Sequence, residues 1–167
     1  IDNVCTWEWN NQTDIGKTFA ESVDEKIAEF PEWEKEIRMY WEQWEDMIGG
    51  AVEGMEEWIR ELKEAGYNVY GLSNWSSETF PLVKNKFPVF GMMDGIVMSG
   101  EELIAKPDLR IYQILLDRYG LKADECVFID DRQSNIDAAQ VIGIHGITFK
   151  SCEQTKQAFH QIANKYN

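Results

Sequence analysis

The sequence predicts an α/β fold: a parallel sheet covered by helices, preceded by a small helical unit. From residue 52 onwards, short apolar runs alternate with amphipathic segments, which is typical of right-handed βαβ units. The run Cys126-Val-Phe-Ile129 is continuously apolar, as in a parallel strand buried on both faces. Residues 1–50 contain only helical patterns and hold five of the seven tryptophans. We therefore divide the chain into a helical unit at 1–50 and an α/β core at 51–167.

The helical unit is predicted from apolar residues that recur every three or four positions. Phe19, Val23, Ile27 and Phe30 form one such face, and Pro31 suits the first turn of a second helix. The second helix is expected to end at Gly49 and carries the stripe Trp33, Ile37, Tyr40, Trp41, Trp44 and Ile48. Its large aromatics favour packing in a small core, while Trp7 and Trp9 are candidates for lining a pocket.

The α/β core is expected to alternate helix and strand along its whole length. Its first helix has the apolar face Val52, Met55, Ile59 and Leu62 and stops at Gly66. The remaining predicted elements are strand 67–72, helix 80–87, strand 95–98, helix 109–119, strand 126–129, helix 136–142, strand 145–149 and helix 153–166.

Composition excludes several classes of function. The net charge of −14 would repel a nucleic acid backbone, so no nucleic acid partner is expected. No apolar run approaches the roughly 18 residues that span a bilayer, so no membrane partner is expected. Three widely spaced cysteines favour reduced thiols and a cytoplasmic location. Two distant histidines argue against a zinc site or a Ser-His-Asp triad.

Polar residues follow the predicted strands at the edge where α/β proteins bind ligands. Ser73 and Asn74 follow one strand, and Asp130 and Asp131 follow another. Lys106-Pro-Asp108 is expected to open a helix at the same edge, with the proline in its first turn. Singly, each motif is as readily a helix cap or a solvated lysine; together and in this order they are far more specific.

These residue types suit phosphoryl chemistry. Two adjacent carboxylates are costly without a cation, and Mg²⁺ prefers oxygen ligands, so Asp130 and Asp131 are candidate metal ligands. The Lys106 ammonium supplies a point charge for a phosphoryl oxygen. The Ser73 hydroxyl, with N–H groups of the next helix, is expected to bind the other oxygens. The sequence thus predicts a small phosphorylated substrate and Mg²⁺ as cofactor.

The same residues resemble the motifs of the haloacid dehalogenase superfamily. Leu72-Ser-Asn74 resembles its second motif, Lys106-Pro-Asp-Leu-Arg-Ile-Tyr112 its third, and Val127-Phe-Ile-Asp-Asp-Arg-Gln-Ser-Asn135 its fourth, in the two-aspartate form. The likeness covers the whole chain and is greatest to the branch of 2-haloacid dehalogenases and epoxide-hydrolase-related phosphatase domains. It implies a Rossmann-like parallel sheet, with residues 1–50 as a small cap over the active site.

The resemblance also implies roles. Ser73 would bind the phosphoryl group, with Asn74 shaping the site, and Lys106 would orient nucleophile and phosphate. Asp130 would be the main metal ligand, assisted by Asp131, and Asn135 would support their loop. We further expect Trp75 to approach the substrate, and we group Ser73, Lys106 and Asp131 as the catalytic set.

One motif of the superfamily has no counterpart in the sequence. It is an aspartate nucleophile at the end of the first strand, with a second aspartate two residues on. Asp2 and Asp14 do not follow apolar strands. That strand lies centrally in the superfamily's sheet, so we expect a gap between its neighbours and a nucleophile upstream of Ile1.

The leading hypothesis is therefore a magnesium-dependent phosphatase that forms an aspartyl-phosphate intermediate. A metal-independent 2-haloacid dehalogenase is the first alternative, disfavoured by the paired carboxylates. A non-catalytic binding protein is the second. A signalling receiver domain is rejected, because its carboxylates precede its lysine along the chain. A homodimer is among the assemblies left open.

Overall fold

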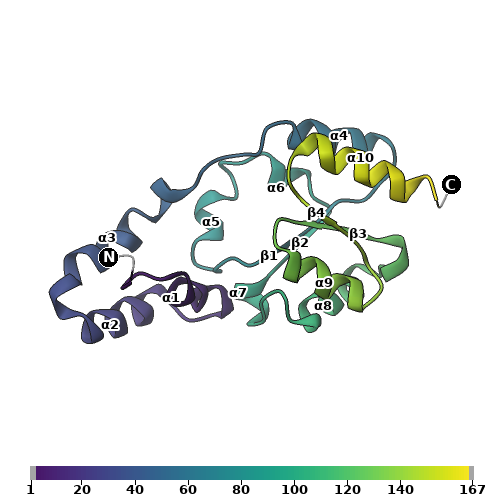
Figure 1. The fold of residues 1–167 in the computed structure, drawn as a ribbon. Helices are drawn as coiled ribbons and strands as arrows, with labels where there is room; N and C mark the ends of the chain where they lie inside the picture. Colours follow the sequence, from purple (N-terminus) through teal and green to yellow (C-terminus); the bar gives the residue numbers. More distant parts are fainter. Residues whose placement is uncertain (1–2, 166–167) are drawn as a thin grey trace.

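The computed structural model describes residues 3–165 and has an α/β core with a helical extension on one side (Figure 1). The predicted fold class is confirmed. The predicted element type is also confirmed at every strand, and strand boundaries differ from the predicted ones by at most three residues. Among the described residues, no helix combines the length and the apolar character that a bilayer crossing requires.

The N-terminal region is helical, as predicted, but its second helix is not continuous. It comprises α1 (Trp7–Asn11), η1 (Thr13–Ile15), α2 (Phe19–Glu29), η2 (Pro31–Trp33), α3 (Glu34–Glu42) and η3 (Trp44–Met47). Pro31 begins a 3₁₀ turn rather than an α-helical one. Gln43 adopts φ −109° and ψ 19°, outside the helical range, which separates α3 from η3.

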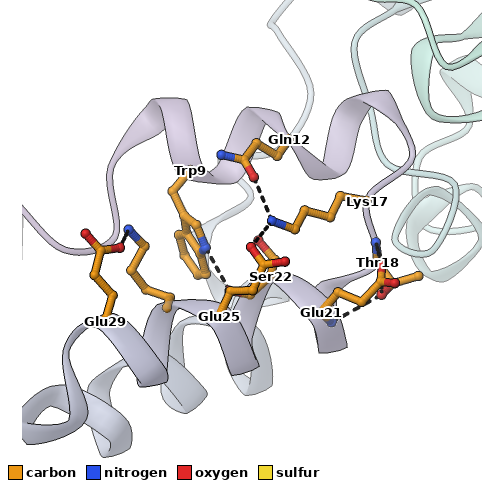
Figure 2. A network of polar contacts seen from close by, with 9 residues as sticks. Trp9, Gln12, Lys17, Thr18, Glu21, Ser22, Glu25 and Glu29 are labelled. Atoms are coloured by element: carbon orange, nitrogen blue, oxygen red, sulfur yellow. Dashed lines mark hydrogen bonds and ion pairs between the residues drawn. The ribbon is translucent and has the colours of Figure 1, made fainter.

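This helical unit has its own core of Val4, Trp9, Val23 and Ile37. The indole Nε1 of Trp9 donates to the carbonyl of Ser22 over 3.0 Å, and Trp9 is only 5% exposed. Trp9 is therefore a packing residue, and it lines neither of the two cavities described below. Figure 2 shows this contact beside the Thr18–Glu21 capping box that begins α2 and the Lys17 ammonium shared by Gln12 and Glu25.

The core begins with α4 (Met55–Glu64), where Gly54, at φ 79°, precedes the helix; Val52 lies outside it. Next come β1 (Tyr70–Ser73), α5 (Phe80–Val83), α6 (Val89–Met92), β2 (Gly95–Met98) and α7 (Ser99–Glu102). They are followed by α8 (Leu109–Tyr119), η4 (Ala123–Glu125), β3 (Val127–Asp130), α9 (Gln133–Val141), β4 (His145–Thr148) and α10 (Cys152–Ala163). The strands of the described part of the chain are those that the apolar runs predict.

Helices cover both faces of the strands (Figure 1). On one face, Ile111, Leu115 and Leu116 of α8 and Ala139 of α9 pack into one buried cluster with Val97 of β2. On the other face, Trp58 of α4 packs edge-on against Phe159 of α10, with Ile147 of β4 in the same cluster. The core therefore has the three-layer arrangement of a doubly wound sheet.

The strands form two separate parallel pairs. β1 pairs with β2 from Tyr70↔Gly95 to Ser73↔Met98, and β3 pairs with β4 from Val127↔His145 to Asp130↔Thr148. Within residues 3–165 no strand joins β1 to β3. A cavity of about 930 Å³ lies between them, lined by both strands and by residues of α8 and α10. The predicted gap in the sheet is thus confirmed.

Candidate functional site

Lys106 bridges the two halves of the sheet. Its Nζ donates to the carbonyl oxygen of Leu72 in β1 over 2.6 Å and to Oδ2 of Asp130 at the end of β3 over 2.8 Å. The side chains of Lys106 and Asp130 are only 9% and 8% exposed. A buried cation and a buried anion at the carboxyl ends of two parallel strands form the centre of the candidate site.

Asn74 fixes the backbone of Lys106. Its Oδ1 accepts from the N–H of Lys106 over 2.8 Å, and its Nδ2 donates to the carbonyl of the same residue over 3.0 Å. The Lys106–Pro107 peptide bond is cis. Asp108 is the N-cap of α8, because its Oδ1 accepts a hydrogen bond from the N–H of Arg110. Pro107 therefore precedes the helix cap, and its predicted place in the first turn is wrong.

The Asp130 carboxylate is held from three sides. Besides Lys106, the N–H of Arg132 and the Nδ2 of Asn135 each donate to Oδ1 over 2.9 Å. Burial raises the pKa of Asp130, but the hydrogen bonds from Lys106, Arg132 and Asn135 outweigh it, so the pKa lies below its usual value. Asn135, predicted to support this loop, is buried and hydrogen-bonded to the carboxylate.

Tyr112 holds Asn135 in place, a role that the sequence did not indicate. Its hydroxyl donates to the carbonyl of Asn135 over 2.9 Å, and its ring is fully buried beside Phe128. Burial, with the nearby charge of Asp130, raises the pKa of Tyr112, so the phenol stays a neutral donor. Apolar periodicity identifies Tyr112 only as a core residue, because nothing local marks the partner of its hydroxyl.

The other predicted site residues lie around this network. Ser73 is half-buried and lines the large cavity beside β3. Asp131 is exposed, next to Asp130 but outside its hydrogen bonds. Residues 74–79 form a loop before the short helix α5, so helix N–H groups do not directly follow Ser73 as expected. Trp75 packs edge-on against Phe80 and Phe90.

The donor chemistry fits a hard cation in part. A carboxylate offers about four lone-pair positions. Hydrogen bonds occupy three of these positions on Asp130 and leave one free for a metal ion. The side chain of the neighbouring Asp131 is exposed. No cluster of three or more Asp, Glu, His or Cys side chains that could hold a metal ion occurs within residues 3–165. Two carboxylates suit Mg²⁺, which keeps several waters, but a further protein ligand would have to come from elsewhere.

The helical N-terminal region lies against this edge of the core. The guanidinium of Arg132 stacks over the ring of Trp7 at 4.4 Å, and the N–H of Phe19 donates to Oε2 of Glu78 over 2.7 Å. Asp14 reaches the loop after β1, where it accepts from the N–H of Ser76. Burial raises the pKa of Asp14 to about 6, against the opposing effect of that hydrogen bond.

Comparison with known proteins agrees with the motifs and the fold. The sequence model of the haloacid dehalogenase-like hydrolases matches residues 5–143, which include Ser73, Lys106 and Asp130. The chain belongs to this family. The resemblance inferred from the three motifs is thereby confirmed, and so is the assignment to a family of hydrolases.

Curated relatives include enzymes of different activities. The sesquiterpene phosphatase AstK of Aspergillus oryzae is 32% identical over 107 residues, which cover 62% of this chain and 55% of that protein. The (S)-2-haloacid dehalogenase 4A of Burkholderia cepacia is 30% identical over 91 residues, covering 54% of this chain and 39% of that protein. The chain thus spans about half or less of the length of these relatives.

Solved structures give the same fold. A magnesium complex of the HAD family enzyme BT-2542 from Bacteroides thetaiotaomicron superposes with a TM-score of 0.76 at 23% identity, covering 95% of this chain and 82% of that one. An aspartate-to-alanine variant of the same enzyme, in complex with magnesium and inorganic phosphate, superposes with a TM-score of 0.69 at 25% identity and covers 87% and 76%.

Proposed function

We propose that the protein is a magnesium-dependent phosphatase that acts on a small phosphate ester through an aspartyl-phosphate intermediate. The observation that carries this proposal is the buried Lys106–Asp130 pair at the carboxyl ends of β1 and β3. It places a fixed positive charge beside a carboxylate that stays ionised, so an anionic substrate and a cation would meet at one point. The net charge of −14 makes such a local positive centre necessary.

Each predicted residue has a defined task in this proposal. The Ser73 hydroxyl and the Lys106 ammonium bind phosphoryl oxygens, while Asn74 keeps the backbone of Lys106 in position. Asp130 and Asp131 would hold Mg²⁺, oriented by Asn135. When bound, the metal ion would neutralise charge on the phosphoryl group. Clamping and neutralising the transferred group is most of what phosphoryl transfer requires.

The nucleophile would come from a further parallel strand in the gap between β1 and β3. Such a strand would satisfy the facing edges of β1 and β3 and fill the apolar cavity between them. A carboxylate at its end would lie beside Lys106, which now donates to the Leu72 carbonyl. That carboxylate would bond to phosphorus as the ester oxygen leaves with a proton, and water would then cleave the acyl phosphate. We place this strand upstream of Ile1.

The helical region 1–50 would act as the cap over this site. The Arg132–Trp7 stacking and the Glu78–Phe19 hydrogen bond support this role, because both join the helical region to loops that follow β3 and β1. The substrate would enter between the two parts and be shielded from water when the cap closes.

A 2-haloacid dehalogenase is the second candidate, and the relative from Burkholderia cepacia favours it. In that reaction the same nucleophile would displace a halide from carbon without a metal ion. The adjacent Asp130 and Asp131 argue for the phosphatase, since a metal-free site has no need of two neighbouring carboxylates.

The test is to express the protein with its upstream segment and assay two reactions in parallel. Release of p-nitrophenol from p-nitrophenyl phosphate is measured with saturating Mg²⁺ and with excess chelator. Halide release from 2-chloropropionate is measured in the same two buffers. We expect magnesium-dependent phosphate release, abolished by Asp130→Asn. Halide release that survives chelation would establish the dehalogenase instead, and inactivity of both kinds would favour a binding protein.

A further inference from the structure

A second, smaller cavity lies between the helical region and the loop after β1. Its volume is about 160 Å³. Asn10 and Asp14 line it from the helical region, and Asn74, Trp75 and Ser76 line it from the core. Asn74 also clamps the backbone of Lys106, so this cavity adjoins the candidate phosphoryl site. A group attached to a bound phosphate could extend into it.

Several side chains of this cavity have no donor to spare. The Thr13 hydroxyl donates to the carbonyl of Asn10 over 2.7 Å. The Trp75 indole donates to Oγ1 of Thr79 over 2.9 Å, and that hydroxyl donates on to the carbonyl of Ser76. The amide of Asn74 donates one of its two N–H groups to the Lys106 carbonyl, so Asn74 keeps one donor. The Thr13, Trp75 and Thr79 donors hold the cavity in shape rather than offering hydrogen bonds to a ligand.

Acceptors, in contrast, remain available. Oδ1 of Asn10 is buried and has no hydrogen-bond partner in the structure. The Asp14 carboxylate accepts one hydrogen bond, from the N–H of Ser76, although a carboxylate offers about four lone-pair positions. An unpaired buried acceptor is unfavourable unless a ligand supplies a donor. The polar lining therefore favours a ligand that donates hydrogen bonds.

The remaining walls are aromatic. Phe19, Trp44 and Trp75 line the cavity, and the rings of Trp44 and Trp75 meet edge-on with centroids 6.2 Å apart. Aromatic faces suit the methylene groups of a short chain and also attract a cation. The cavity thus combines apolar walls with acceptors, one of which is a carboxylate.

We infer that this cavity binds the leaving group of the substrate, and that the leaving group is a short alcohol carrying a hydroxyl or ammonium donor. Asn10 and Asp14 are then specificity-determining residues contributed by the helical region. This inference rests on the proposed phosphatase function, since it assigns the part of the substrate that phosphoryl transfer releases. A leaving group without a donor would leave both acceptors unpaired and would bind less well.

Three phosphate monoesters of similar size test it: O-phosphoethanolamine, 2-hydroxyethyl phosphate and propyl phosphate. Binding is measured by calorimetry and hydrolysis by phosphate release, on the protein with its upstream segment and Mg²⁺. We expect the two donor-bearing esters to exceed propyl phosphate about tenfold in affinity and in kcat/KM, the worth of one good hydrogen bond. A larger gain for the ammonium ester than for the hydroxyl ester would assign the main role to the charge of Asp14.

Matched variants separate this inference from the function on which it rests. Asp14→Asn and Asn10→Ala should each reduce the preference for donor-bearing esters, measured as the ratio of kcat/KM for each of these esters to kcat/KM for propyl phosphate. Asp24→Asn, an exposed position on α2, should leave the preference intact. Equal use of the three esters by the unmodified protein, or an unchanged preference in both variants, would overturn the inference and leave the phosphatase standing. Failure to bind or hydrolyse any ester would overturn both.

Discussion

The ammonium of Lys106 lies 2.8 Å from Oδ2 of Asp130, and this ion pair connects the two halves of an otherwise divided sheet. Lys106 also reaches the Leu72 carbonyl on β1, whereas Asp130 ends β3. Both side chains are more than nine-tenths buried. The pair therefore has a structural role across the gap as well as the proposed role in binding phosphate.

Replacing Lys106 by Met should destabilise the protein by about 3 kcal/mol, because it leaves the Asp130 carboxylate buried without its cation. Urea unfolding at pH 7, followed by circular dichroism, measures the change. Lys122→Met is the matched control: Lys122 pairs with Glu125, but the two side chains are 72% and 64% exposed, so this substitution should change the unfolding midpoint little. Equal effects of the two substitutions would contradict a buried pair.

The lowered pKa of Asp130 predicts that the stability of the folded protein depends on pH in the acidic range. A carboxyl whose pKa is lower in the folded state than the ordinary 3.8 stabilises the fold above that value, and loses this contribution as the pH falls through its folded pKa. Asp130→Asn should therefore be less stable than the unmodified protein at pH 7, with the difference shrinking below about pH 4. A difference that stays constant from pH 7 to pH 3 would show that the charge of Asp130 is not responsible.

Asp14 predicts the opposite pH dependence. Its pKa is raised to about 6 from 3.8, so ionisation opposes folding, and stability from this group falls as the pH rises from 3.8 to 6. Asp14→Asn keeps an acceptor for the Ser76 N–H and removes the charge. It should raise stability at pH 7 by about 1–2 kcal/mol, a figure already reduced for residual solvent screening. Thermal unfolding at pH 4 and pH 7 checks this, since little gain is expected at pH 4.

A stabilising Asp14→Asn substitution that also loses the preference for donor-bearing esters would be informative. Functional groups are often retained at a cost in stability. Asp24→Asn again serves as control and should change neither property. If Asp14→Asn proved destabilising at pH 7, the carboxylate would have a structural partner stronger than the Ser76 N–H.

The sequence predicts the bounds of elements in the α/β core more closely than those in the helical region, because residues at the ends of the core elements mark where they begin or stop. β2 and α8 have the expected bounds, because Gly95 and Gly120 lie where each apolar pattern begins or ends. The division of the second helix into η2, α3 and η3 follows from the non-helical backbone at Trp33 and Gln43, which apolar periodicity does not record. The cis peptide before Pro107 likewise has no local signal that distinguishes it from a proline in a first turn.

The candidate site was predictable where residues follow strands, and not where they meet across the fold. Lys106 and Asp130 could be chosen from sequence because the carboxyl ends of parallel strands share one edge. Asn135 lies within α9 and was indicated only by the resemblance to the haloacid dehalogenase motifs. Asp14 could not, since it reaches the loop after β1 only because the helical region folds back on the core. The Leu72 carbonyl is a backbone group, which residue type alone never singles out.

Tyr112→Phe should cost about 1 kcal/mol and weaken the site without changing the fold. The substitution removes the 2.9 Å hydrogen bond to the Asn135 carbonyl, and that buried acceptor loses a donor. Tyr67→Phe, at a residue 41% exposed, is the control and should have little effect. Urea unfolding gives the stability, and the Mg²⁺ dependence of phosphate release shows whether Asn135 still orients Asp130. A fully stable Tyr112→Phe protein with unchanged Mg²⁺ dependence would remove Tyr112 from the site.

The gap between β1 and β3 predicts that an added strand will be bound. A strand of about six residues, apolar and ending in aspartate, matches the usual strand length and would pair with both facing edges. Supplied as a synthetic peptide, it should slow amide hydrogen exchange in residues 70–73 and 127–130 and raise the unfolding midpoint of the 167-residue chain as its concentration increases.

A scrambled peptide of the same composition controls for apolar association, because it keeps the hydrophobicity and loses the strand pattern. Protection by the scrambled peptide would mean that the cavity binds apolar chains without register. If only the intended peptide slows amide exchange in both strands, the cavity binds a strand in register. A shift of the Lys106 Nζ resonance on binding would then show that the aspartate of the peptide lies where the proposed nucleophile is needed. Because neither readout depends on turnover, the strand hypothesis can fail while the phosphatase assignment is still tested by its own assay.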